Sequence, residues 1–226
     1  YATLFAPVRT HGGFVSDVVG DAMLAVWAQA QPEASQCAQA CRAALEVAQA
    51  AEHFRVAPDS AGLATRIGLH AGPILLGNVG AADHIEYRAV GDIVNTASRL
   101  QALNKALGTR VLASRETVAG LDGFRLRALG SFRLPGKSRA TDVFELRGLT
   151  GEVVPGEREL LQDFAAAFEE FTARRFEAAR AGFVRCLERF PDDGPAGCYV
   201  ALCEYYISQP PAPDWDGVVS AADIPA

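Results

Sequence analysis

The stretch that decides the fold is Tyr87-Arg88-Ala89-Val90-Gly91-Asp92-Ile93-Val94-Asn95-Thr96-Ala97-Ser98-Arg99-Leu100. Its first four residues are predicted to be extended, and Gly91 interrupts them. Asp92 stands where a helix N-cap is preferred, and apolar residues then recur at helical spacing from Val94 to Leu103. We expect this helix to end near Gly108. The stretch therefore predicts a strand, a turn and an amphipathic helix.

A β-hairpin is predicted upstream of this stretch. Residues 14–19 and 23–27 are β-branched or apolar runs, and Gly20-Asp21 separates them as a turn. Further elements are expected as a helix at 33–54, strands at 63–70 and 74–79, strands at 110–113, 124–134 and 142–146, and a short helix capped by Ser114. We expect the strands at 63–70 and 74–79 to pair. The alternation favours an α+β fold, an α/β sandwich with helices on one side of a largely antiparallel sheet.

A change in composition at residues 147–156 predicts a boundary. Glycine and proline punctuate this segment, so we divide the chain into a domain at 1–148 and a helical tail at 149–226. Three helices are expected in the tail, at Glu157–Arg174, Phe176–Phe190 and Ala196–Ile207. The phenylalanines of these helices are interpreted as core. From Pro210 onward the chain has no periodicity, and we expect an irregular segment.

Charge and composition exclude several classes of protein. The net charge is −6 at pH 7 with no Lys/Arg cluster, which argues against a nucleic-acid surface. No apolar run approaches the ~18 residues that a membrane helix needs, and the first ten residues lack the pattern of a signal peptide. The five cysteines form no Cys-x-x-Cys pair and fit a reducing compartment, where Cys37 and Cys41 are expected as buried thiols.

Three residues are candidates for phosphate chemistry. Asp21 lies on a predicted turn, a placement that presents a carboxylate to a divalent cation, although Gly-Asp turns are also common without function. Asn95 and Arg99 are four residues apart and share a helix face. The arginine suits a phosphate and the asparagine a sugar hydroxyl. The alternative for this pair is a solvated helix face.

Four motifs carry a family resemblance. They are Gly20-Asp21-Ala22-Met23-Leu24-Ala25, Arg66-Ile67-Gly68-Leu69-His70-Ala71-Gly72, residues 87–100, and Leu129-Gly130-Ser131-Phe132-Arg133-Leu134-Pro135-Gly136-Lys137. In order and spacing they resemble the catalytic domain of class III adenylate and guanylate cyclases over nearly all of the first 146 residues. The C-terminal segments 190–195 and 210–217 resemble the tail of bacterial adenylate cyclases that carry a CHASE2 sensor and membrane helices upstream.

This resemblance implies a ferredoxin-like α/β sandwich that acts as a head-to-tail homodimer with active sites at the interface. Asp21 matches the second of two metal-binding aspartates, Asn95 the residue that orients the ribose, and Arg99 the residue that stabilises the reacting phosphate. The aspartates of one chain would meet Asn95 and Arg99 of the other. The implied cofactors are Mg²⁺ or Mn²⁺, two ions per active site.

The sequence departs from the family pattern in three ways. The first metal aspartate of the family lies upstream of the segment seen here, so we expect the chain to be N-terminally truncated, and inactive alone. Asp17 and Arg88 stand where adenylate cyclases place a base-reading Lys and Asp; they either read adenine with exchanged charges or form a salt bridge. The phosphate-binding lysine falls at Pro135, which leaves Lys137 as a shifted substitute.

The sequence thus predicts an adenylate cyclase that converts ATP to 3′,5′-cyclic AMP and pyrophosphate. The alternatives are a catalytically inactive pseudo-cyclase that binds nucleotide or a partner, and a guanylate cyclase. The resemblance and the cysteines together predict a cytoplasmic domain of a membrane-anchored signalling protein.

Overall fold

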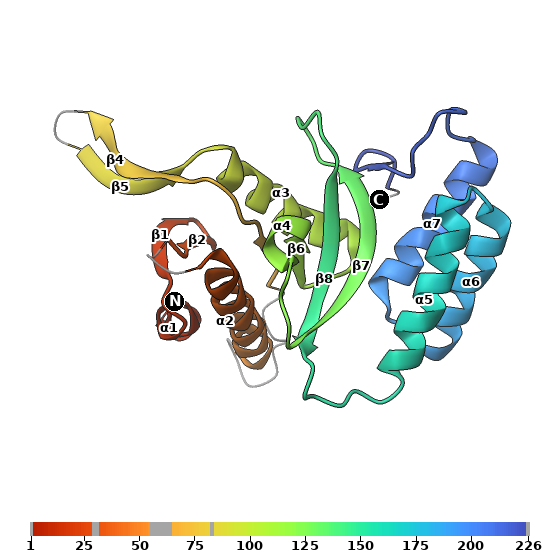
Figure 1. Cartoon of the computed structure of the whole chain (residues 1–226), viewed down its shortest axis with the longest axis horizontal. Helices are drawn as coiled ribbons and strands as arrows, with labels where there is room; N and C mark the ends of the chain where they lie inside the picture. Colours follow the sequence, from red (N-terminus) through yellow and green to blue (C-terminus); the bar gives the residue numbers. More distant parts are fainter. Residues whose placement is uncertain (1, 29–31, 55–64, 82–83, 225–226) are drawn as a thin grey trace.

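The structure, a computed structural model, describes residues 2–28, 32–54, 65–81 and 84–224. A central five-stranded sheet lies between a helical group at the C-terminal end and two separate hairpins at the other (Figure 1). The strands of the sheet, in spatial order, are β3 (Ile67–Leu69), β6 (Val111–Ser114), β8 (Thr141–Leu149), β7 (Phe124–Arg133) and β9 (Val219–Ser220). β8 is antiparallel to both of its neighbours, whereas β3 is parallel to β6 and β9 is parallel to β7.

The two hairpins form their own two-stranded sheets. β1 (Phe14–Val19) pairs with β2 (Ala22–Val26) around the predicted Gly20-Asp21 turn, and β4 (Leu75–Ala81) pairs with β5 (His84–Val90). The expected pairing of strands 63–70 and 74–79 is therefore wrong. β4 pairs along all seven of its residues with β5, the next strand in the chain, in antiparallel orientation. The three-residue β3 pairs in parallel with β6. Residues 63 and 64 of the expected strand lie outside the described residues.

Helices cover both faces of the sheet, contrary to the expectation of one. Successive residues of a strand point to opposite faces. Leu112 of β6 packs with the apolar face of α3 (Asp92–Leu107), whereas Val111 and Ala113 pack with α2 (Glu33–His53) on the other side. α1 (Ala2–Thr10) packs on α2, and the short α4 (Arg115–Val118) follows β6. The sheet is thus a middle layer between α3 and α2.

The three predicted tail helices are α5 (Glu157–Thr172), α6 (Phe176–Arg189) and α7 (Gly194–Ser208). Their aromatic side chains belong to one core that also contains residues of α3 and β7, including Leu107 and Leu129. The expectation of an irregular segment after residue 210 is wrong at its end, because β9 forms there and extends the sheet. The division at 148/149 stays a prediction.

All five cysteines are buried and free, as expected for Cys37 and Cys41. Burial raises the pKa of Cys41, Cys198 and Cys203 to about 12, so these thiols are protonated near neutral pH. No helix in the described part of the chain combines the length and apolar character that crossing a membrane requires.

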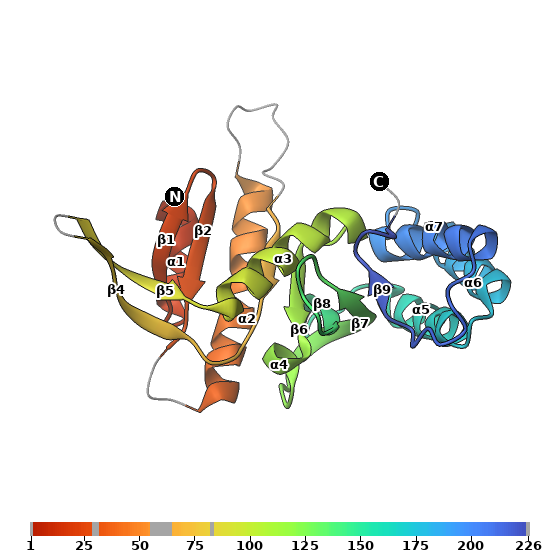
Figure 2. The same cartoon turned by 90° about the horizontal axis from the view of Figure 1, so that it is seen from above.

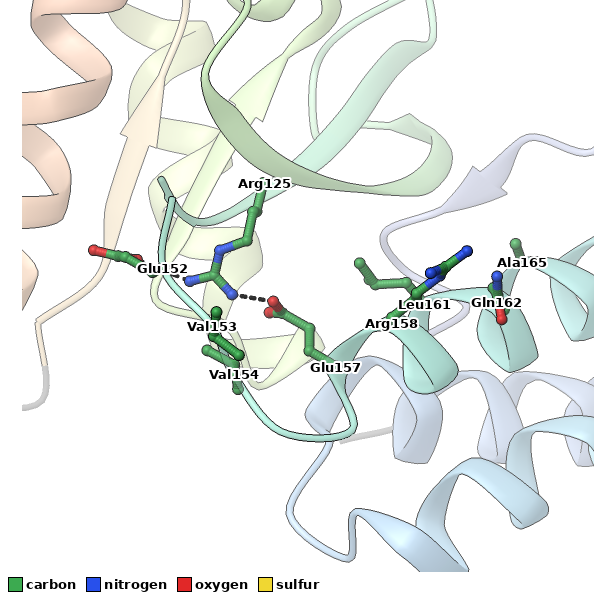
Figure 3. A pocket seen from close by; sticks show the side chains of 9 residues that line it. All are labelled: Arg125, Glu152, Val153, Val154, Glu157, Arg158, Leu161, Gln162 and Ala165. Carbon is green, nitrogen blue, oxygen red and sulfur yellow. Dashed lines mark hydrogen bonds and ion pairs between the residues drawn. The ribbon is translucent and has the colours of Figure 1, made fainter. Parts of the chain in front are cut away.

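Charged side chains join the sheet to the tail helices. Arg127 of β7, 2% exposed, contacts Glu145 of β8 at 2.7 Å and Asp193 at 2.8 Å, and its guanidinium lies 4.8 Å from the ring centre of Phe164. Asp193 also caps α7 by accepting a hydrogen bond from the amide of Ala196 at 2.9 Å. A second junction sits nearby, where Arg125 lies between Glu152 and Glu157 (Figure 3). These ion pairs fix α5 and α7 against β7.

We predict that Asp193→Ala strongly destabilises the fold. The change removes the helix cap and leaves Arg127 buried with a single carboxylate, so the free energy of unfolding should fall by about 3–5 kcal/mol. Thermal and urea unfolding measure it. The control is Asp192→Ala, the neighbouring exposed carboxylate, which should change stability by less than about 0.5 kcal/mol. Equal stability of both variants would contradict a structural role for the Arg127 contacts.

Candidate active site

Asp17 and Arg88 face each other across the two hairpins. Asp17 Oδ2 lies 3.5 Å from Arg88 Nη2, and both side chains are partly exposed. The hairpins are also linked by the amide of Ala89, which donates to Ser16 Oγ at 3.1 Å. The structure therefore brings together the two residues of the expected base-reading pair, β1 contributing the carboxylate and β5 the guanidinium.

Asn95 and Arg99 lie on the first two turns of α3. Asn95 is exposed and Arg99 is partly exposed, on the helix face that their spacing predicts. Gly91, with φ of 133°, occupies the N-cap position, so the expectation that Asp92 caps the helix is wrong. Asp92 instead is the first helical residue and makes no capping hydrogen bond. Its carboxylate is thereby available to another partner.

That partner is Lys137, whose Nζ donates to the Asp92 carboxylate. This hydrogen bond, together with the charge of Lys137, holds the pKa of Asp92 below its ordinary value. Gly136, the preceding residue, lies against Arg99: a Cβ at position 136 would be 3.1 Å from Arg99 Nη2. The structure thus brings Lys137 to the N-terminus of α3, beside the helix that carries Asn95 and Arg99.

Asp21 stands apart from this group. It is exposed on the β1–β2 turn, as predicted. Among the described residues, no group of three or more His, Cys, Asp or Glu side chains is placed to hold a metal ion. A site for two divalent cations needs more carboxylate oxygens than one aspartate supplies. The described residues alone do not fit such a site.

One cluster near α3 was not expected from the sequence. His70 Nδ1 lies 2.8 Å from Ser114 Oγ, and the Ser114 hydroxyl lies 3.3 Å from that of Thr117. Burial, partly opposed by the Glu116 carboxylate, lowers the pKa of His70 and favours its neutral form. His70 follows β3 and Ser114 ends β6, so the carboxyl ends of two parallel neighbours meet there. This placement after adjacent parallel strands is the signal that could have identified them.

A close approach fixes α3 on the sheet. A Cβ on Gly68 of β3 would lie 2.2 Å from the carbonyl oxygen of Ala97 and 2.3 Å from the amide nitrogen of Gln101. Asn104 Nδ2 donates to the carbonyl of Ile67 at 2.9 Å. The absence of a side chain at position 68 therefore sets where Asn95 and Arg99 stand.

A pocket of about 510 Å³ lies elsewhere, between the start of β7, the loop after β8 and α5. Figure 3 shows its lining, with Arg125, Val153 and Leu161 among the side chains. None of the residues proposed for the active site lines it.

The family model for the adenylate and guanylate cyclase catalytic domain matches residues 10–147. The chain belongs to this family. The matched range includes all of the candidate site residues described above. The family as a whole uses divalent metal ions, and adenylate and guanylate cyclases share it.

Curated relatives of both kinds are similar to this cyclase domain. It is 39% identical over 158 residues to "Adenylate cyclase 1" of Rhizobium meliloti, covering 68% of this chain and 24% of the relative. It is 27% identical over 209 residues to the terminal-differentiation specific adenylate cyclase of Dictyostelium discoideum, covering 87% and 10%. Mouse "Guanylate cyclase 2G" is 30% identical over 161 residues, covering 69% and 14%. The chain thus spans between a tenth and a quarter of the length of these relatives.

Solved structures confirm the α+β nucleotide cyclase fold. The adenylyl cyclase CyaB from P. aeruginosa aligns with a TM-score of 0.57 at 20% identity, covering 67% of this chain and 80% of that one. The guanylate cyclase domain of RhGC from Catenaria anguillulae, solved with GTP, aligns with a TM-score of 0.54 at 23% identity, covering 65% and 79%. The solved structures therefore agree with membership of the cyclase family. Adenylate and guanylate cyclases both match, so the choice between ATP and GTP has to be argued from the site residues.

We predict that Gly68→Ala displaces α3 of the cyclase domain. The added methyl group meets backbone atoms that cannot rotate away, so the variant should lose about 1–3 kcal/mol of stability. For a domain of this size that corresponds to a fall in Tm of about 2–12 °C. Gly77→Ala on β4 is the matched control, because nothing lies within 4 Å of its added Cβ. A Gly68→Ala variant as stable as the control would contradict the close packing of α3 on β3.

Proposed function

We propose that this domain is an adenylate cyclase that converts ATP to 3′,5′-cyclic AMP and pyrophosphate in intracellular signalling. The observation that supports it most is a group of side chains at the N-terminal half of α3. Asn95 and Arg99 belong to the helix, and Lys137 is held beside it by its bond to Asp92. A hydroxyl-orienting amide and two cations stand together at one helix end, the set that a nucleoside triphosphate requires. The family membership and the adenylate cyclase relatives support the reaction class.

In the proposed reaction, the ribose 3′-oxygen attacks the α-phosphorus. The new O3′–Pα bond forms as the bond from Pα to the bridging oxygen breaks, pyrophosphate leaves with that electron pair, and the 3′-hydroxyl proton passes to solvent. Asn95 orients the ribose by hydrogen bonding, which holds the attacking oxygen in line. Arg99 stabilises the charge that accumulates on the phosphate oxygens, and Lys137 binds the polyphosphate.

Asp17 and Arg88 are proposed to recognise adenine. The Asp17 carboxylate accepts a hydrogen bond from the exocyclic amine, and the Arg88 guanidinium donates to a ring nitrogen. Their 3.5 Å contact means that both groups already converge on one place before the base arrives. To bind a base, they must exchange this partly exposed contact for hydrogen bonds to the ligand, at a modest cost.

Divalent cations, Mg²⁺ or Mn²⁺ and two per active site, are proposed as cofactors, with Asp21 as one ligand. The proposal rests on the exposure of Asp21 at its turn and on the family. Asp21 is the one ligand that we name, since the described residues contain no group of three or more side chains placed to hold a metal ion.

The proposed partner is a second copy in a head-to-tail homodimer. The two hairpins expose apolar side chains, Val19 at 68% and Leu75 at 71%, together with Val18 and Val90. Exposed apolar groups clustered around Asp17 and Arg88 favour burial against another chain.

We also propose, from the resemblance of the C-terminal segments, that the natural protein carries a CHASE2 sensor and membrane helices upstream, with this domain in the cytoplasm.

The contact between Asp17 and Arg88 also favours a second candidate function. A pair that stays closed on itself would leave no groups for the base, and the domain would act as a pseudo-cyclase that binds nucleotide or a partner chain without turnover. A guanylate cyclase is the third candidate, since base choice depends on these two positions.

We predict that Asn95→Ala with Arg99→Ala abolishes cyclic-nucleotide production by the full-length protein. Loss of both the ribose and the phosphate contacts should lower kcat by at least about 1,000-fold. The assay supplies ATP or GTP with Mg²⁺ or Mn²⁺ and measures cyclic nucleotide and pyrophosphate. Lys105→Ala, an exposed cation further along α3, is the control and should keep wild-type activity. Undiminished activity of the double variant would exclude the proposed site.

We predict that Asp17 and Arg88 act as a pair in substrate choice. Asp17→Lys or Arg88→Asp alone places like charges together and should lower kcat/KM for ATP about 10-fold or more, while the double exchange recovers most of it. The control exchanges the exposed pair Arg180 and Glu204 and should have no effect. If the single variants have the kcat/KM of the wild type, Asp17 and Arg88 form a salt bridge and take no part in substrate choice. Better use of GTP by the wild type would indicate a guanylate cyclase, and no product with either nucleotide a pseudo-cyclase.

A further inference from the structure

The C-terminal residues 209–224, named here the strap, run from the end of α7 back to the sheet (Figure 2). The strap contains β9, which pairs with the last two residues of β7. Val219 lies opposite Phe132 and Ser220 opposite Arg133. Val219 is buried, and the amide of Ala221 donates to the Arg133 carbonyl at 3.2 Å. The strap thus covers an edge of β7 that would otherwise be open.

Arg174 holds the proline-rich start of the strap. Its guanidinium donates to the carbonyl oxygens of Pro211 and Ala212 at 2.8 Å and of Pro213 at 3.1 Å. Among the described residues, Arg174 is the one non-glycine with positive φ, at 63°, in the turn between α5 and α6. A side chain in this backbone conformation costs energy, so its contacts must over-determine it.

Trp215 fixes the middle of the strap. Its ring packs within 6 Å of Phe171, Phe176 and Tyr206, centre to centre, and its Nε1 donates to the carbonyl of Val218 at 2.8 Å. The guanidinium of Arg174 lies 5.9 Å from the same ring. Arg174 and Trp215 therefore determine together where the chain enters β9.

The strap's end is adjacent to the site on α3. Arg133, the partner of Ser220, is followed by the fully buried Leu134 and then by the turn that contains Gly136 and Lys137. Gly136 lies against Arg99, and Lys137 binds Asp92. A shift of β7 at Arg133 would therefore move the groups that touch both Arg99 and the start of α3.

We propose that the strap is a positioning element for the phosphate-binding side of the active site, and that Arg174 is its positioning residue. Resting on the proposed function, this gives the helical tail a role in turnover: it fixes the end of β7, and through it residues 134–137, against Arg99 and Asp92. Arg174 touches no substrate and acts through the backbone of the strap.

The test compares Arg174→Ala with Arg175→Ala in the full-length protein. Arg175 is the exposed neighbour whose side chain binds Glu170 and does not reach the strap, which makes it a matched control. Amide hydrogen exchange at residues 130–137 reports on positioning without reference to activity. We expect exchange there to become about 10-fold faster in Arg174→Ala and to stay unchanged in the control.

The kinetic part measures kcat and KM for ATP in the same variants. Misplaced phosphate-binding groups should lower kcat about 10- to 100-fold, because Arg99 stabilises the reacting phosphate, and should also raise KM, because Lys137 binds the polyphosphate before the reaction. If Arg174→Ala does not fold, Arg174→Lys serves instead, since a single ammonium nitrogen replaces the two guanidinium nitrogens that contact the three carbonyls and should weaken these contacts.

Two results would overturn the proposal: unchanged exchange at residues 130–137, or faster exchange with wild-type kcat. A wild-type protein that makes no cyclic nucleotide, yet shows the coupled exchange, would contradict the proposed function and leave the coupling of the strap to β7 supported. The two failures are therefore distinguishable.

Discussion

The structure depends on how closely α3 can approach its neighbours. Helix and strand backbones come within contact distance at Gly68, and the C-terminal end of α3 meets the start of α7 where Gly108 and Gly194 touch. Neither approach tolerates a Cβ. Because α3 carries Asn95 and Arg99 on its opposite, exposed side, these two contacts fix where both side chains lie relative to the sheet and the tail helices. The buried charges around Arg127 then hold α7 in register with β7.

Much of the fold was predictable from local patterns. The hairpin around Gly20-Asp21, the helix from Glu33 and the helix before Gly108 all have clear periodicity and end signals, and the structure has them. The pairing of the strands was not predictable in the same way. β3 pairs with β6, which follows α3 in the chain, and not with the next apolar run. β9 was missed because two residues after a proline-rich segment carry no period, and only the exposed edge of β7 explains the strand.

The candidate site shows the same division. Asn95 and Arg99 follow from helical spacing and the family motif, and Asp17 and Arg88 were identified as a pair that the structure places together. The role of Asp92 as the partner of Lys137 depends on a contact between residues 45 positions apart, which no local pattern contains. His70 and Ser114 meet only because β3 and β6 are parallel neighbours. The site contacts that could not be predicted are therefore those that depend on the topology of the fold, not on the types of the residues.

The salt bridge between Asp17 and Arg88 has a consequence for how this domain can evolve. If an ancestor carried the opposite charges at these two positions, replacing one charge by its opposite would have placed two like charges within contact distance, at a cost that grows as the site excludes water. Each route between the two arrangements passes through such an intermediate, or through a neutral residue at one position. The two positions are therefore expected to change together among descendants, as one inherited unit.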